Sequence, residues 1–225
     1  MKSEKNSKNS WEYKYIKSTN FLKIQKLCEQ AQKHHLFCFI VGHSGLGKSH
    51  GFSNYIINNE FAHWREVDPS LAATSFYRKI ISDFEGYQVN EQESLNYFIT
   101  LAAHHLTRAA QHNLFIIDEA GNFKKGMLKY LREFRDKTEE RSGLIISGPP
   151  NFYNDFNQWH RDEVRGIEEM MTRIDEYLFL EPPSYDERAA LCHINGLTDP
   201  TLINQIAEEC DNFRSIRKRI EKYYR

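Results

Sequence analysis

The stretch that most constrains the fold of this 225-residue chain is Gly42-His43-Ser44-Gly45-Leu46-Gly47-Lys48-Ser49. It follows the apolar run Phe37–Val41 and fits the pattern G-x-x-x-x-G-K-[ST] at every fixed position. A buried strand before the glycines and a segment that can start a helix after them are the context that this pattern requires. The sequence therefore predicts a phosphate-binding loop in an α/β fold. An ordinary glycine turn between strand and helix is the alternative.

Each part of this loop suits one part of a triphosphate. Gly42, Gly45 and Gly47 can adopt backbone angles that are closed to other residues, so successive N–H groups can turn inward around an anion. A helix that starts near Lys48 adds unpaired N–H groups and the positive end of its dipole. Lys48 would reach the β- and γ-phosphates, and the Ser49 hydroxyl would ligate Mg²⁺. The candidate ATP-binding residues are Gly42, His43, Ser44, Gly45, Leu46, Gly47, Lys48, Ser49 and His50.

A second signature lies at Leu114–Glu119. Its first four residues are apolar and predict a strand that is buried on both faces, as in a parallel sheet between helices. Asp118 and Glu119 follow at the carboxyl end of this strand, where ligands bind in such sheets. Asp118 would then hold Mg²⁺ through water, and Glu119 would be the general base that polarises the attacking water. An acidic cap at a helix N-terminus is the alternative for this pair.

A third buried strand is predicted at Gly143–Ser147, before the break Gly148-Pro149-Pro150. The hydroxyl of Ser147 could hydrogen-bond the attacking water or the γ-phosphate, or it could simply start the turn. Two further strands are expected, at 64–68 and 177–180. Apolar spacing and caps predict helices over about 19–35, 48–59, 70–84 and 91–110, one that contains Met127 to Phe134, and a helical region over 151–176.

These elements suggest three parts. Residues 1–18 are polar and indicate an N-terminal arm, residues 19–183 form the α/β ATPase core, and residues 184–225 form a helical lid. Ser184 and Glu187 offer a capping box for the first helix of the lid. Asp199-Pro200 and Asp211-Asn212 mark the starts of two further helices.

Composition excludes several classes of protein. A hydrophobic content of 40% and an aromatic content of 13% indicate a globular chain. No apolar run approaches the ~20 residues of a membrane span, and no signal-peptide core is evident, so we expect a cytoplasmic protein without a membrane partner. The four cysteines suit buried thiols, because their spacing fits no zinc site. The net charge of −1 shows no global basic excess, although basic residues crowd both ends of the chain.

Together the loop, the Asp118-Glu119 strand, the strand ending in Ser147, the segment Thr172-Arg173-Ile174 and the lid with Asp211-Asn212-Phe213-Arg214 resemble an AAA+ ATPase over residues 19–225. The compact order of motifs resembles the MuB and TnsC transposition ATPases and their ExeA-like relatives. This resemblance implies a P-loop parallel sheet flanked by helices, with a small C-terminal helical lid. It also implies that Ser147 is sensor 1, Arg173 an arginine finger for a neighbouring subunit, and Arg214 sensor 2. Arg161, Arg165 and Arg217 are alternatives for the last two roles.

The resemblance further implies a function. Members of that family assemble as ATP-bound filaments around duplex DNA and recruit or regulate a transposase, and hydrolysis would depend on assembly. Arg78 and Lys79 are the DNA-contact candidates by analogy, with an exposed, solvated helix face as the alternative. Longer relatives carry additional DNA-binding or partner-binding parts, so any grip on DNA would come from the core and its short tails. A second hypothesis, motivated by the near-neutral charge, is an ATP-gated assembly switch in secretion or defence signalling without DNA binding.

Overall fold

The computed structural model describes residues 12–82, 90, 92–108, 111–123 and 125–224. The chain divides into two compact units. The first comprises Asn20–Glu181, and the second combines the residues up to Thr19 with Pro182–Arg225. Each unit is described by itself.

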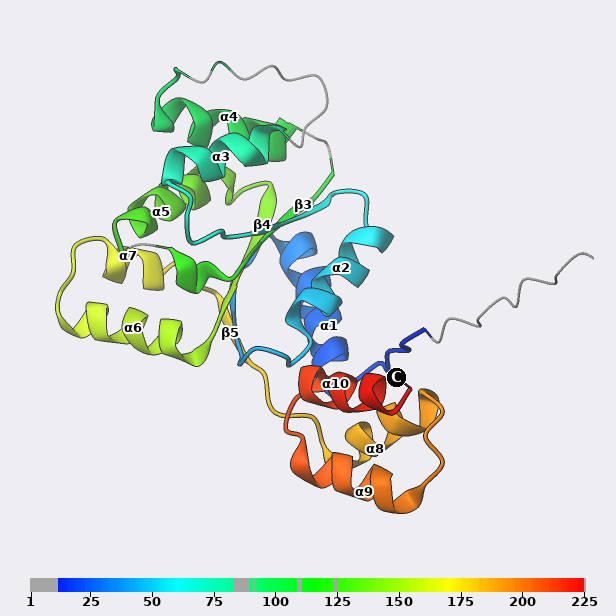
Figure 1. Cartoon of the computed structure of the whole chain (residues 1–225). Helices are drawn as coiled ribbons and strands as arrows, with labels where there is room; N and C mark the ends of the chain where they lie inside the picture. The colour runs from blue at the N-terminus through cyan, green and yellow to red at the C-terminus, as the bar shows by residue number, and fades with distance from the viewer. Residues whose placement is uncertain (1–11, 83–89, 91, 109–110, 124, 225) are drawn as a thin grey trace, which may run out of the picture. The chain divides into compact units, whose positions relative to one another are not determined.

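The first unit is built on a five-stranded parallel sheet in the order β2-β3-β4-β1-β5. Since all strands run in the same direction, their carboxyl ends lie at one edge, which is where ligands bind in such sheets (Figure 1). Residues that follow β1, β3 and β4 therefore come close together. The strands are β1 (Phe37–Val41), β2 (Ala62–Glu66), β3 (Asn113–Asp118), β4 (Ser142–Gly148) and β5 (Glu176–Phe179).

Helices cover both faces of this sheet, as the sequence predicted. Along β1, Phe37, Phe39 and Val41 join a core cluster on one face, while Cys38 and Ile40 join another cluster on the opposite face. This alternation follows from the two-residue period of a strand. The second cluster is covered by α1 (Thr19–His34) and α2 (Lys48–Asn58). The larger cluster lies against α3 (Ala73–Ser82), α4 (Leu95–Arg108), α5 (Leu128–Thr138), α6 (Pro150–Arg161) and α7 (Ile167–Met171).

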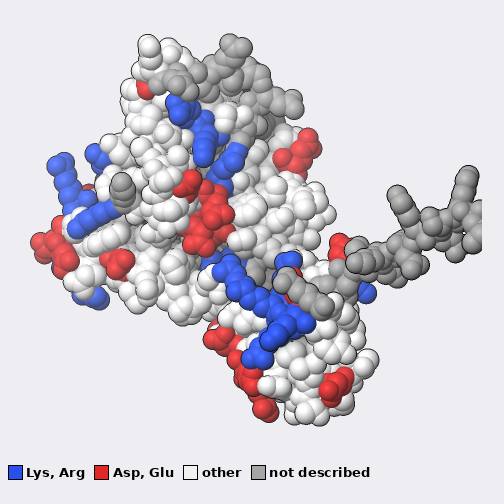
Figure 2. All heavy atoms as spheres, viewed as in Figure 1, with Lys and Arg blue, Asp and Glu red and all other residues white. Residues whose placement is uncertain are grey.

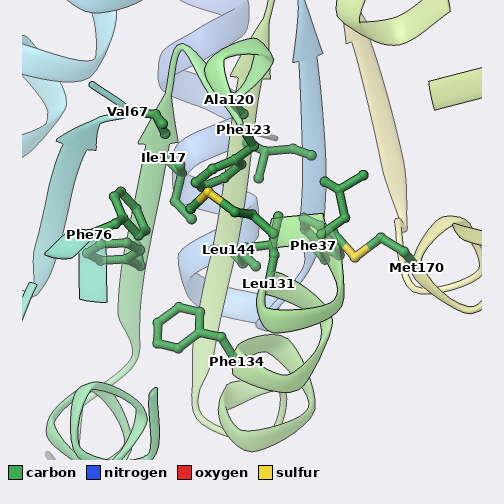
Figure 3. Close-up of a cluster of buried hydrophobic side chains, with 14 of the residues drawn as sticks. Phe37, Val67, Phe76, Ile117, Ala120, Phe123, Leu131, Phe134, Leu144 and Met170 are labelled. Carbon is green, nitrogen blue, oxygen red and sulfur yellow. The ribbon is translucent and has the colours of Figure 1, made fainter. Parts of the chain in front are cut away.

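The larger core shows how the helices are anchored. In Figure 3, Leu131 of α5 and Met170 of α7 lie near the strand residues Leu144 and Phe37, while the ring of Phe134 points to the side, 5.7 Å from the ring of Phe115 in β3. All of these side chains are buried. Full burial of an aromatic or aliphatic side chain of this size stabilises the fold by roughly 1.5–3 kcal/mol relative to exposure. This packing fixes the helices against the sheet and so fixes the strand ends that carry the candidate site residues.

Element boundaries differ from the predictions in several places. β2 begins at Ala62 and ends at Glu66, two residues earlier than expected, because it pairs in register with β3 from Leu114 to Asp118. The region 151–176 divides into α6 and α7, since Gly166 adopts a left-handed φ of 90° between them. The expected end of the third helix near residue 84 lies outside the described residues, and α3 ends at Ser82.

The second unit contains α8 (Tyr185–Ile194), α9 (Pro200–Glu209) and α10 (Phe213–Tyr223) around a core of its own. The predicted capping box is present: the Ser184 side chain accepts from the Glu187 N–H, and the Glu187 carboxylate accepts from the Ser184 N–H. Tyr13 and Ile16 pack against this core. Residues 12–18 thus group with the C-terminal helices, while the division into arm, core and lid stays a prediction.

Among the residues that the structure describes, no helix combines the length and apolar character that a membrane crossing needs. The four cysteines lie buried as free thiols. Burial is the main cause that raises the pKa of the Cys38 thiol to about 12 and that of Cys192 to about 11. Both groups are therefore neutral at ordinary pH.

Candidate nucleotide-binding site

Two of the three glycines in the loop between β1 and α2 adopt the special backbone angles that the sequence suggested. Gly45 and Gly47 have φ values of 85° and 92°, in the left-handed region where a side chain would be strained, whereas Gly42 does not have a positive φ. The Gly42 N–H donates to the Gly148 carbonyl at 3.0 Å, so the start of the loop is held by the end of β4. Lys48 begins α2, and the helix N-terminus therefore lies directly beside the loop.

Lys48 lies inside this loop and is only 6% exposed. Its Nζ donates to the carbonyl oxygens of Gly42 at 2.6 Å and His43 at 3.1 Å. Removing an ammonium group from water is unfavourable unless it meets strong acceptors. The two carbonyl oxygens compensate the burial of Lys48 and hold its ammonium group inside the loop, where the loop would bind a phosphate.

Asp118 connects three separate elements. Its buried carboxylate accepts a hydrogen bond from the Ser49 hydroxyl of α2 at 2.8 Å through Oδ2. Oδ1 accepts from the Ser147 hydroxyl of β4 and from the Glu119 N–H at 2.9 Å. Three of the residues singled out in the sequence are therefore brought together from positions 49, 118 and 147.

Glu119 follows Asp118 in an unusual conformation. Its φ of 54° is left-handed, which is uncommon for a residue with a side chain and costs on the order of 1–2 kcal/mol. Glu119 is the N-cap of a short 3-10 helix, Ala120–Asn122, and its carbonyl accepts from the Asn122 N–H at 2.9 Å. The Asn122 side chain in turn donates to the Val67 carbonyl at 2.9 Å. These bonds fix the turn and keep Glu119 at the carboxyl edge of the sheet.

The chemistry of these groups fits a magnesium nucleotide. Loop amides, Lys48 and the α2 N-terminus supply donors and positive charge for phosphates. Ser49 and Asp118 supply a hydroxyl and a carboxylate 2.8 Å apart, and oxygen ligands of this kind suit Mg²⁺. Ser147 and Glu119 border the same carboxylate.

Two residues beside the loop complete this region. The ring of His50 lies 5.7 Å from that of Phe21, and burial lowers the pKa of His50, which favours the neutral imidazole. The side-chain amide of Asn20 donates to the Leu46 carbonyl within the loop at 3.3 Å. Sequence reasoning missed Asn20. The signal that could have found it was its spacing, since Asn20 shares the buried stripe of α1 with Ile24, Leu27 and Ala31.

Arg173 lies away from the loop of its own chain. Its guanidinium pairs with the carboxylate of Asp136, with Nε to Oδ1 at 2.5 Å, and also donates to the Glu169 carbonyl. Two residues later, the Asp175 N–H donates to the carbonyl of Phe37, the first residue of β1, at 2.7 Å. Arg173 therefore lies near the amino ends of the strands, whereas the loop follows their carboxyl ends.

The remaining arginine candidates have different surroundings. Arg161 ends α6 and donates to Gln158 at 2.7 Å, and Arg165 is exposed in the turn before α7. In the second unit, Arg214 is exposed at the start of α10, while Arg217 pairs with Glu221 at 2.7 Å.

The DNA-contact candidates lie on α3. The buried residues of this helix are Phe76, Tyr77, Ile80 and Ile81, so Arg78 and Lys79 fall on its outer side, where Arg78 is half-buried and Lys79 exposed. Figure 2 shows Lys and Arg side chains over the region of α3 and, in the second unit, over α10.

Solved structures with the same fold include three archaeal proteins. Cdc6p from Pyrobaculum aerophilum superposes with a TM-score of 0.67 at 16% identity, over 97% of this chain and 63% of that one. The Aeropyrum pernix ORC2 protein, solved as ADPNP–ADP complexes, gives 0.65 at 12% identity over 94% and 62%. The ORC1 protein of the same organism, solved in complex with DNA, gives 0.64 at 13% identity over 94% and 62%. The chain thus spans less than two thirds of the length of each.

Sequence comparison gives two results. No curated protein matches the chain. A family model described as an AAA domain matches residues 31–155, more than half of the chain, and this range contains the loop, Asp118 and Ser147. The parallel five-stranded sheet with flanking helices and a C-terminal helical region agrees with that assignment. The chain therefore belongs to the AAA domain family of P-loop ATPases.

Proposed function

We propose that this protein binds and hydrolyses ATP with Mg²⁺, assembles with copies of itself on duplex DNA and regulates DNA transposition. The observation that carries the first step is the group formed by Lys48, Ser49, Asp118 and Ser147, whose hydrogen bonds link the loop to the ends of β3 and β4. The DNA and transposition steps rest on the order of motifs in the sequence.

Binding is assigned to the loop. The N–H groups of residues 42–49 and the α2 N-terminus would receive the phosphates, and Lys48 would exchange its carbonyl partners for phosphate oxygens. Ser49 and Asp118 would hold Mg²⁺, which neutralises charge on the phosphates when it is bound. His43, Ser44 and Leu46 contribute backbone groups, and His50 borders the loop.

Hydrolysis is assigned to water attack on the γ-phosphate. Glu119 would accept the proton of the attacking water, and Ser147 would orient that water or the γ-phosphate. Ser147 is well placed for this role, since its buried hydroxyl already reaches the carboxylate beside Glu119. The left-handed turn at Glu119 holds the base at a fixed position instead of on a mobile loop.

Completion of the site requires a second subunit. Arg173 lies near the amino ends of the strands, so an arginine-finger role is open to it only toward the ATP of a neighbouring copy. Such a cation stabilises charge in the transition state. We assign residues 1–18 as an arm, 19–183 as the ATPase core and 184–225 as a lid, with Arg214 as the nucleotide-sensing arginine of the lid. Arg161, Arg165 and Arg217 are the alternatives for these two roles.

Contact with DNA would be made mainly with phosphates. Arg78 and Lys79 on the outer side of α3 are the candidates, and such contacts need no base readout. A structure of a protein with the same fold, ORC1 of Aeropyrum pernix, was solved in complex with DNA, which supports the plausibility of this partner. A transposase would then be recruited by the DNA-bound assembly.

The test is phosphate release from ATP by the purified chain, with and without duplex DNA. We expect DNA-stimulated turnover that Lys48→Ala abolishes, while Lys26→Ala, the same change at an exposed lysine of α1, leaves it intact. Absence of turnover under all conditions would contradict the enzymatic assignment. Turnover without any response to DNA would instead favour the ATP-gated assembly switch in secretion or defence signalling.

Salt dependence tests the DNA surface. We expect the double change Arg78→Ala with Lys79→Ala to weaken duplex binding and to flatten its dependence on salt, because fewer counterions are released. The matched control is Lys23→Ala with Lys26→Ala, which removes the same charge from an exposed face of α1. Equal binding by the two double variants would remove α3 from the interface.

A further inference from the structure

Asn20 is a buried polar residue that the proposed mechanism does not use. It is 4% exposed and lies on the apolar stripe of α1. Its side-chain Nδ2 donates to the Leu46 carbonyl at 3.3 Å and to the Glu181 carbonyl at 2.8 Å. One amide group thus joins segments that are 26 and 161 residues away.

The first of these bonds acts on the phosphate loop. Leu46 lies between Gly45 and Gly47, which both have left-handed φ values. Because these neighbours are glycines, no side chain of theirs can hold the peptide groups in place. A trans peptide is planar, so its C=O and the N–H of the next residue point in opposite directions. By holding the Leu46 carbonyl, Asn20 sets the direction of the Gly47 N–H, one of the loop donors for phosphate.

The second bond lies at the border of the unit. Asn20 and Glu181 are its first and last residues. The chain enters this unit at Asn20 and leaves it after Glu181. Within that other unit, Glu187 makes an equivalent bridge, since its carboxylate accepts from the N–H groups of Thr19 at 2.5 Å and Ser184 at 2.9 Å. In each unit, the two points where the chain crosses to the other unit are therefore held together by hydrogen bonds to one side chain.

We propose that Asn20 is a positioning residue for the nucleotide: its amide fixes the phosphate loop at Leu46 and ties that loop to the connection at Glu181. This inference rests on the proposed nucleotide-binding function of the loop. It assigns to Asn20 no contact with the nucleotide itself. Its effect passes through the Leu46–Gly47 peptide.

The test replaces the amide donors by a carboxylate of the same shape in Asn20→Asp. The matched control is Asn113→Asp, because Asn113 is 3% exposed, belongs to the same unit and also donates to a backbone carbonyl, that of Leu106 at 2.7 Å. Both variants bury the same new charge, but only the first faces the loop. Asn20→Ser, which keeps one donor, provides a second variant if the first fails to fold.

The first readout needs no nucleotide. Amide hydrogen exchange of the ligand-free protein should become faster in peptides that cover residues 43–50 and 178–186 in Asn20→Asp, and in neither of them in Asn113→Asp. The second readout is the affinity for a fluorescent ADP analogue with Mg²⁺. We expect it to fall roughly 10- to 100-fold in Asn20→Asp and to change little in the control, as two hydrogen bonds to the amide are lost.

A pH series separates positioning from general destabilisation. When the introduced carboxyl is protonated it can donate one hydrogen bond, and burial raises its pKa toward the accessible range. The affinity deficit of Asn20→Asp relative to Asn113→Asp should therefore shrink as the pH falls. Equal exchange and equal affinity in the two variants would overturn the inference. Failure of the unaltered protein to bind the ADP analogue would overturn the proposed function, and the exchange experiment would still decide whether Asn20 orders the loop.

Discussion

At the scale of single residues, the separation of binding from hydrolysis is the sharpest consequence of the site. Glu119→Gln removes the base but keeps a side chain of the same size, and its N–H still donates to Asp118. We expect ATP to bind with near-normal affinity and turnover to fall at least ~100-fold, within the range of general-base removal. Equilibrium binding and phosphate release measured on the same preparation check this. Glu29→Gln, an exposed change on α1, is the control, and normal turnover in Glu119→Gln would place the base elsewhere.

The residues of the candidate site differ in how far the sequence predicted their positions. Lys48, Ser49 and Asp118 were predictable because each motif places a defined group at a strand end. The role of Ser147 stayed open between the nucleotide and a turn, and its hydrogen bond to Asp118 was not predicted. Asn20 was not found, because its partners are backbone carbonyls and no sequence pattern marks a carbonyl.

At the scale of elements, the packing of α1 on the sheet depends on a missing side chain. A Cβ at Gly143 in β4 would lie 2.2 Å from the Ala31 carbonyl oxygen of α1, which is backbone and cannot rotate away. We expect Gly143→Ala to lower the free energy of unfolding by about 1–3 kcal/mol or more, as over-packed cores do. Urea unfolding measures this. Gly126→Ala is the control, since a Cβ there meets nothing within 4 Å, and equal stability of the two variants would show that α1 can move away from β4.

The start of α8 gives a prediction about pH. Partial burial alone would raise the pKa of Glu187, but hydrogen bonds from Thr19 and Ser184 outweigh it, so the pKa is lowered in the folded protein. A lowered carboxyl pKa contributes stability that is complete above the unfolded value of about 4.3 and is lost as the pH falls below it. Thermal unfolding should therefore show Glu187→Gln as destabilised near pH 7 and close to the unaltered protein near pH 3. A constant difference across this range would contradict the role of the charge.

Most elements were predictable from periodicity, and the exceptions have local causes. Strands buried on both faces appear as apolar runs, which is why β1, β3 and β4 were found. β2 is only partly buried, so its start at Ala62 depends on pairing with Leu114, which no local pattern records. The strand order and the grouping of residues 12–18 with the C-terminal helices are long-range features, carried by contacts such as the Lys14 N–H to Asn195 Oδ1 at 2.8 Å.

At the scale of the whole molecule, the position of Arg173 predicts activity that two different subunits share. β1 is five residues long, so its two ends lie roughly 13–16 Å apart, farther than an arginine side chain reaches. An Arg173 near the amino ends of the strands cannot serve the ATP of its own chain. As an arginine finger it would therefore have to act on the ATP of a neighbouring copy.

Mixing variants tests this arrangement. Arg173→Ala should lose at least ~100-fold in turnover, and Lys48→Ala should be inactive, yet an equal mixture should regain activity, because one subunit supplies an intact loop and the other the arginine. Asp136→Asn is the control for structure, since it breaks the same ion pair and leaves the arginine in place. We expect this variant to keep or exceed normal turnover, as Arg173 is then released from Asp136. If the mixture stayed inactive while Asp136→Asn remained active, the arginine-finger role of Arg173 would be wrong, and Arg161 or Arg165 would become the candidates for the neighbouring site.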